Sequence, residues 1–150
     1  MRFQRPAIML AALWWGGLSA LAFVAVPMLF ATLGGPALAG PVAARLFTVL
    51  AWATLLLGVV LLVLLRQPRS GENLPSPEAL TLIGVVLFAM LLALLQEFVV
   101  AQRIVTARAS GGNLRLWHGL GSALVVGQWV CSGWVLWRLT LGQSVVTRTA

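Results

Sequence analysis

One carboxylate stands inside an otherwise uncharged stretch of this chain. The chain has three acidic residues, all glutamates, and Glu72 and Glu78 lie in or beside a polar connection. Glu97 instead follows the apolar stretch that begins at Ala79. A carboxylate at membrane depth is costly unless it is paired or neutralised, so Glu97 is the first candidate for function.

The order of the apolar segments predicts which polar residues share the membrane side of Glu97. We expect a polar cluster at one end of a helix bundle, made of Glu97, Gln96, Arg45, Arg103, Arg115 and His118. Two interpretations stay open. In the first, the cluster carries a function. In the second, Glu97 lies at the membrane interface and only pairs with an arginine, which fixes the helix register.

The other reactive residues do not form a metal or catalytic set. His118 is the only histidine and Cys131 the only cysteine. They are about 20 Å apart along one helix at roughly 1.5 Å per residue. The chain has no Asp and no phosphate-binding loop. We therefore expect no catalytic residues, no metal site and no cofactor, and a protein that is not an enzyme.

Four polar residues fall at mid-membrane depth: Ser19, Thr54, Gln128 and Ser132. Such residues often form hydrogen bonds between helices, and they can also line a substrate path. Both interpretations stay open.

Small residues recur at a spacing of four in the first and last apolar segments. They are Ala12, Gly16 and Ala20, and then Gly119, Ala123 and Gly127. This spacing keeps them on one helix face, where another backbone can approach closely. Either the two stripes pack against each other, or one receives a partner protein. Pro27 should bend the first helix near Phe23.

Composition sets the environment in which these residues work. The chain is 61% hydrophobic and 9% charged. Soluble domains are roughly 45–50% apolar and ~25% charged. A net charge of +7 comes from ten arginines. Most of them flank apolar runs, so we expect contact with the lipid bilayer and not with nucleic acid.

Four apolar runs are long enough to cross a hydrocarbon layer. We expect a single integral membrane domain over residues 1–150, with helices at about 7–33, 46–65, 79–103 and 116–138. Gly34-Gly35-Pro36 should end the first helix and Gly40-Pro41 should lead into the second. Short connections make neighbours antiparallel. The fold class is all-α, a four-helix transmembrane bundle without a soluble domain.

Arginine counts predict the orientation. Arg2, Arg5, Arg66, Arg69, Arg138 and Arg148 fall on one side. Arg45, Arg103, Arg108 and Arg115 fall on the other. The excess favours cytoplasmic termini, and the composition is typical of a bacterial inner-membrane protein.

The first half of the chain carries a pattern of apolar residues and glycines. It consists of Trp15-Gly16-Gly17, Phe23, Pro27-Met28-Leu29-Phe30, Leu33, Ala39-Gly40 and Phe47. Together with Arg115-Leu116-Trp117-His118, it resembles the transmembrane-protein-205-like family, a small four-helix membrane domain of unknown function in bacteria. The resemblance implies the same fold and no catalytic residues. Eukaryotic relatives are associated with the handling of metal-containing drugs, which points toward transport.

Two functions are compatible with these residues and their spacing. The first is an accessory subunit that binds membrane partners or a second copy through its small-residue faces. The alternative is a small transporter component whose polar path passes Gln128 toward Glu97 and His118.

Overall fold

The structure, a computed structural model, describes residues 4–66 and 76–146. Four residues considered above lie outside these ranges: Arg2, Arg69, Glu72 and Arg148. The described residues form helices and no strand, and four helices are long and apolar enough to cross a membrane. This confirms the four-helix transmembrane fold.

Two of the four spans contain a π-helical turn. The first span consists of α1 (Gln4–Ala20), the π-helical turn η1 (Leu21–Ala25) and α2 (Val26–Thr32). The second span is α3 (Pro36–Leu65). The third consists of α4 (Pro77–Leu95), the π-helical turn η2 (Gln96–Ala101) and α5 (Gln102–Ser110), and the fourth is α6 (Leu114–Val146).

The second helix begins ten residues earlier than expected, at Pro36 instead of residue 46. Gly34 and Gly35 make the turn with φ of 69° and 148°, values that L side chains rarely adopt, and Pro36 occupies the first helical turn. The assignment of Gly40-Pro41 to the helix start was therefore wrong, because Pro41 lies inside α3. The third span also continues beyond residue 103, to Ser110, before Gly111 turns the chain with φ of 74°.

The first span departs from regular α-helix near Phe23, where Pro27 was expected to disturb it. Pro27 has no N–H to donate to the carbonyl of Phe23, and the backbone forms the turn η1 just before it. The second π-helical turn, η2, contains no proline. It begins at Gln96 and Glu97, so it lies in the polar part of the third span.

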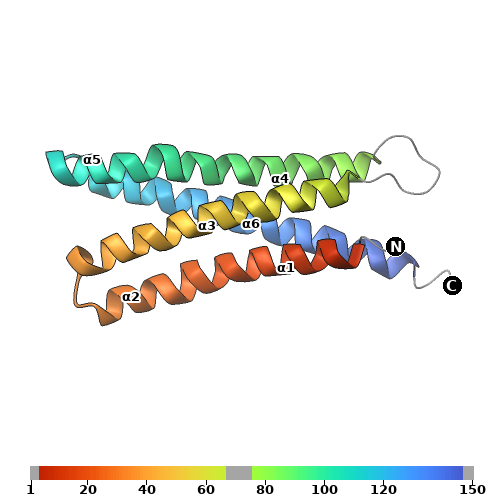
Figure 1. Ribbon diagram of the computed structural model, residues 1–150, viewed down its shortest axis with the longest axis horizontal. Coiled ribbons are helices and arrows are strands. Elements are labelled where there is room, and N and C mark those ends of the chain that lie inside the picture. Colours follow the sequence, from red (N-terminus) through yellow and green to blue (C-terminus); the bar gives the residue numbers. More distant parts are fainter. Residues whose placement is uncertain (1–3, 67–75, 147–150) are drawn as a thin grey trace.

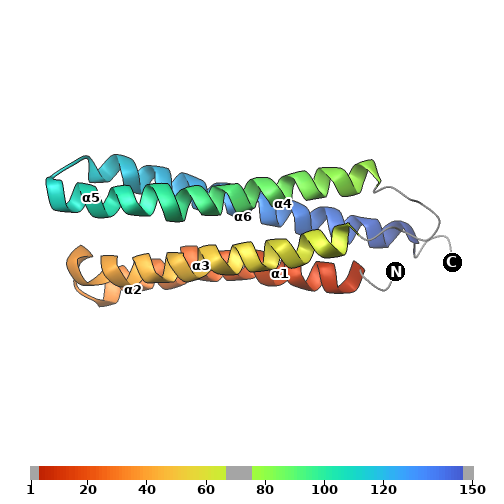
Figure 2. The same cartoon turned by 45° about the horizontal axis from the view of Figure 1, so that its top comes forward.

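Each span packs against two neighbours, in the order α1, α3, α4 and α6 around the bundle. Figures 1 and 2 show that α1 begins and α6 ends at the same end, here called the terminal end. The short connections 33–35 and 111–113 lie at the opposite end, the turn end. Toward the turn end, the pair α2–α3 diverges from the pair α5–α6 in both views.

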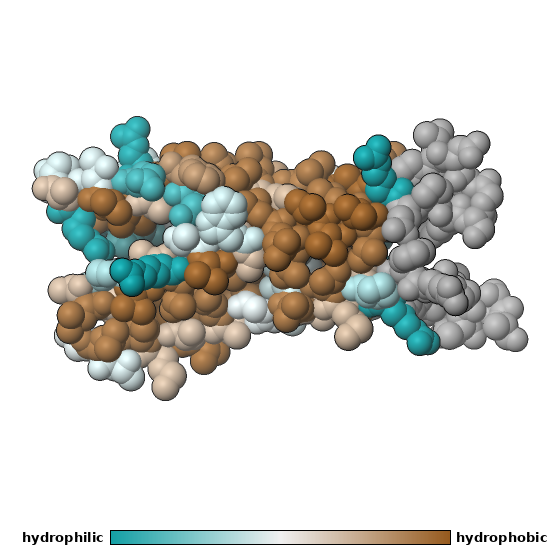
Figure 3. Space-filling model, in the orientation of Figure 1, coloured by the Kyte–Doolittle hydropathy of each residue, from teal (hydrophilic) through white to brown (hydrophobic). Residues whose placement is uncertain are grey.

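Apolar side chains form a band across the middle of the bundle. Figure 3 shows this band between two ends with hydrophilic side chains. Only 22% of the residues in the apolar part of each span are buried inside the bundle. Most side chains of each span are therefore at least partly exposed on the outer surface of the bundle.

The interior of the bundle is narrow, and all four spans contribute apolar side chains to it. Its largest fully buried apolar members are Trp14, Leu18, Leu61, Val86 and Val135. These five residues lie in the half of the bundle nearer the terminal end, and their burial holds α1, α3, α4 and α6 together there.

The two small-residue stripes do not pack against each other. Ala12 and Ala20 are exposed on α1, and Gly119 and Ala123 are exposed on α6. The helices α1 and α6 meet through larger side chains instead, with the Trp15 ring against Gly133 and against the Trp129 ring. Of the two alternatives, the one in which the stripes pack against each other was therefore wrong.

Gly127 is the member of the α6 stripe that makes a close interhelical contact. A Cβ at this position would lie 2.9 Å from Cδ1 of the buried Leu92 on α4. We expect Gly127→Leu to destabilise the bundle by about 1–3 kcal/mol through overpacking. Thermal or denaturant unfolding in detergent measures this loss.

Gly84→Leu provides the matched control, because Gly84 is exposed on α4 and a Cβ there meets no atom within 4 Å. Its unfolding should stay close to that of the unmodified protein. Equal losses in both variants would contradict the packing of α6 on α4 at this position.

Candidate polar site

Two tryptophan side chains form hydrogen bonds between the first span and its neighbours. The Trp14 indole on α1 donates to the Thr54 hydroxyl on α3 at 3.1 Å. The Trp129 indole on α6 donates to the Ser19 hydroxyl on α1 at 2.8 Å. Ser19 in turn donates to the Trp15 carbonyl at 2.8 Å, so its hydroxyl is used both as a donor and as an acceptor.

The turn η2 connects the third span to both of its neighbours through consecutive residues. The Gln128 amide on α6 donates to the Gln96 side-chain oxygen at 2.9 Å. The Thr48 hydroxyl on α3 lies 3.0 and 3.1 Å from the two carboxylate oxygens of Glu97. Gln96 therefore binds toward α6 and Glu97 toward α3.

These four pairs form what we call the hydrogen-bond ring, since each span is bonded to the span on either side. Its members are Trp14, Ser19, Thr48, Thr54, Gln96, Glu97, Gln128 and Trp129. Thr54 and Gln128 are almost completely buried. Lipid offers no hydrogen-bond partners, so polar groups at this depth must find them within the protein.

The four predicted mid-membrane polar residues are thus accounted for by bonds inside the chain. Ser19, Thr54 and Gln128 belong to the ring, and the buried Ser132 donates to the Trp129 carbonyl of its own helix at 3.1 Å. Among the described residues, every buried side-chain nitrogen and oxygen has a partner.

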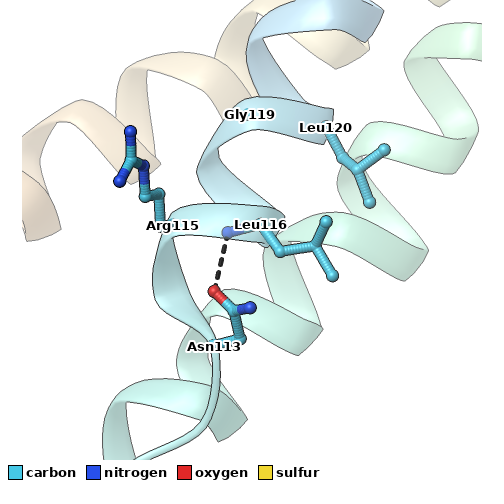
Figure 4. A pocket seen from close by; sticks show the side chains of 5 residues that line it. All are labelled: Asn113, Arg115, Leu116, Gly119 and Leu120. Carbon is cyan, nitrogen blue, oxygen red and sulfur yellow. Dashed lines mark hydrogen bonds between the residues drawn. The ribbon is translucent and has the colours of Figure 1, made fainter.

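The structure does not assemble the predicted cluster around Glu97. The Arg103 guanidinium lies 5.7 Å from the centre of the Trp117 ring, and Arg45 and His118 are exposed. Arg115 lines a shallow depression at the start of α6. Figure 4 shows the Arg115 side chain on the opposite side of α6 from Leu116 and Leu120, while the Asn113 side chain accepts from the Leu116 N–H and caps the helix.

Of the six predicted cluster residues, Gln96 and Glu97 enter the ring, each with a different partner. Within residues 4–66 and 76–146, no ion pair joins Glu97 to an arginine or to His118, and Thr48 bonds to its carboxylate. Thr48 was not singled out from the sequence. The only sequence feature that could have indicated Thr48 is its position one helical turn after Arg45. This feature becomes informative only once α3 is known to face η2.

The arrangement is suited to holding helices together. The same described ranges contain no group of three or more His, Cys, Asp or Glu side chains that could hold a metal ion. Cys131 is half-buried on α6 and has no disulfide partner there.

A double-mutant cycle tests whether Glu97 is held by Thr48. Glu97→Met keeps the side-chain length but removes the acceptor, and Thr48→Val removes the donor. We expect a coupling free energy of about 0.6–1.7 kcal/mol between the two changes, as for other hydrogen bonds between membrane helices. Unfolding in detergent of the two single variants and the double variant gives this value.

Two further cycles serve as controls. Glu97→Met combined with Arg45→Gln, and with Arg115→Gln, should give effects that add within about 0.5 kcal/mol. Coupling to either arginine without coupling to Thr48 would restore the ion-pair interpretation.

Comparison with known proteins assigns the chain to a family. A search of the curated proteins and a search of the solved structures found no match. A family model described as "Domain of unknown function (DUF4149)" matches residues 9–113. This region contains the first span from residue 9 onward, the whole of the second and third spans, and six of the eight ring residues, all except Gln128 and Trp129. With most of its length covered by this match, the chain belongs to the DUF4149 family of proteins of unknown function.

Proposed function

We propose that the protein is a small interaction subunit in the membrane, which binds a transmembrane helix of a partner protein or of a second copy. The observation that carries this proposal is the outward position of the α1 stripe. Ala12 and Ala20 are exposed, and a Cβ at Gly16 would meet no atom within 4 Å. Small residues on an outward face allow a second backbone to approach closely.

The surroundings of the stripe support this use. Met9 and Leu13, which lie beside it on the same face, are 73% and 63% exposed. Large apolar side chains beside a row of small ones form the shallow groove in which membrane helices pack by van der Waals contact. A helix face that only contacted lipid would not need a row of small residues.

The alternative of a transport path receives less support. Such a path would pass Gln128, but the Gln128 amide is bonded to Gln96 and the side chain is 2% exposed. We also propose that the protein is not an enzyme, because the buried polar groups of its described residues are engaged in hydrogen bonds within the chain.

Mass measurement of the protein purified in mild detergent tests the proposal. We expect an assembly heavier than one chain, either a homo-oligomer or a complex with another membrane protein. Gly16→Leu should shift the protein toward the single-chain mass, because its side chain fills the groove, while its Cβ meets no atom of the described chain within 4 Å.

Unfolding of Gly16→Leu in detergent should remain close to normal, and Gly84→Leu, with the same change on an exposed face of α4, should leave the assembly intact. A single-chain mass for the unmodified protein, or an assembly that survives Gly16→Leu, would contradict the proposal.

We further propose a bacterial inner-membrane location with both termini in the cytoplasm. The described arginines Arg5, Arg66 and Arg138 belong to the terminal end, and the outlying Arg2, Arg69 and Arg148 add to the same side in the sequence. The turn end carries four arginines, so the excess is on the terminal side. From the motif between Trp15 and Phe47 in the sequence, we also propose that the chain is related to the transmembrane-protein-205-like proteins.

Reporter fusions after Ala150 test the orientation. We expect a fused green fluorescent protein to be fluorescent and a fused alkaline phosphatase to be inactive, since the first works only in the cytoplasm and the second only outside it. The opposite pair of signals would place the turn end in the cytoplasm.

A further inference from the structure

Two pairs of side chains join α3 to η2, one that includes a carboxylate and one made of two aromatic rings. Thr48 and Trp52 are one turn apart on α3, and Glu97 and Phe98 are consecutive on η2. Thr48 is bonded to Glu97, and the Trp52 and Phe98 rings meet edge to face with centroids 6.4 Å apart. We call these four residues the α3–η2 seam.

The Glu97 carboxylate has a single neutral donor in the described part of the chain. A carboxylate can accept about four hydrogen bonds, so most of its capacity is unused. The nearby arginines are directed elsewhere. Arg103 stacks on Trp117, and the Arg108 guanidinium lies against α3 at Gly40, where a Cβ would be 2.9 Å from its Nη2. Arg45 is exposed one turn closer to the turn end.

The seam is open to the hydrocarbon layer. Trp52 is 56% exposed and Phe98 is 58% exposed, within spans that carry few charges. Glu97 is itself partly exposed. A molecule that reaches this carboxylate from the lipid must therefore be apolar over most of its surface.

The side chains of the seam favour a molecule with a positive charge. A carboxylate attracts a cation, and the faces of Trp and Phe rings attract it as well through their quadrupoles. Away from water both attractions are stronger, because the surrounding dielectric constant is low.

We propose that the α3–η2 seam binds hydrophobic organic cations from the bilayer, with the positive centre beside Glu97 and the apolar groups against Trp52 and Phe98. This site is separate from the α1 stripe and does not depend on the interaction proposed for it.

Binding of tetraphenylphosphonium to the full chain in nanodiscs of zwitterionic lipid tests the proposal. We expect saturable binding above that of empty nanodiscs. Glu97→Gln removes the charge but keeps an oxygen that accepts from Thr48, and it should weaken binding about tenfold or more. Trp52→Leu should weaken it by about threefold.

Glu78→Gln is the matched control, because Glu78 is an exposed carboxylate in the first turn of α4 at the other end of the bundle. Its binding should be unchanged. Unsaturable binding to the unmodified protein, or equal binding by Glu97→Gln, would overturn the proposal.

A measurement on the unmodified protein decides the question even where Glu97→Gln fails to fold. Dicyclohexylcarbodiimide, an apolar reagent for carboxyl groups, should modify Glu97 from the lipid, as detected by peptide mass spectrometry. Tetraphenylphosphonium should slow this modification severalfold, whereas tetraphenylborate, which has the same shape and the opposite charge, should not. Equal effects of the two ions on this modification would contradict a cation site at the seam.

Discussion

The need to satisfy polar groups in a solvent without hydrogen-bond partners governs this bundle. Apolar contacts alone distinguish poorly between alternative helix packings in a bilayer, because lipid tails are as apolar as leucine. The hydrogen-bond ring supplies that distinction. Its four pairs connect each span with its two neighbours, for example Trp14 with Thr54 and Trp129 with Ser19. They thereby define both the order of the helices and their vertical register.

The turn η2 allows one short segment to serve two neighbours. Its first two residues, Gln96 and Glu97, are bonded to α6 and α3 respectively. Beyond this turn the pairs α2–α3 and α5–α6 diverge toward the turn end. The ring thus holds the bundle together where the polar residues occur. The aromatic rings of Trp52 and Phe98 in the seam and the small residues of the α1 stripe take no part in these hydrogen bonds, and they are the surfaces that we propose for binding.

The sequence was sufficient for the number, type and order of the helices, because long uncharged runs leave few alternatives in lipid. Hydrogen bonds between helices were one of its two interpretations of Ser19, Thr54 and Gln128, and the structure contains such bonds at all three residues. The direction of the α1 stripe could not be predicted. Spacing shows which residues share a face, but in a bilayer a face of Ala and Gly is equally compatible with the interior and the outside. The partner of Glu97 was missed because Thr48 looks like an ordinary residue of an apolar run.

A double-mutant cycle on Gln96 and Gln128 tests most directly whether ring hydrogen bonds hold the helices together. Gln96→Leu or Gln128→Leu alone leaves the other amide without its interhelical partner, whereas the double variant removes both groups. We expect the free energy of unfolding in detergent to fall in each single variant and the double variant to recover about 0.6–1.7 kcal/mol of the summed loss. Strictly additive losses would contradict a stabilising role of the ring and show that its pairs are close in space without holding the bundle together.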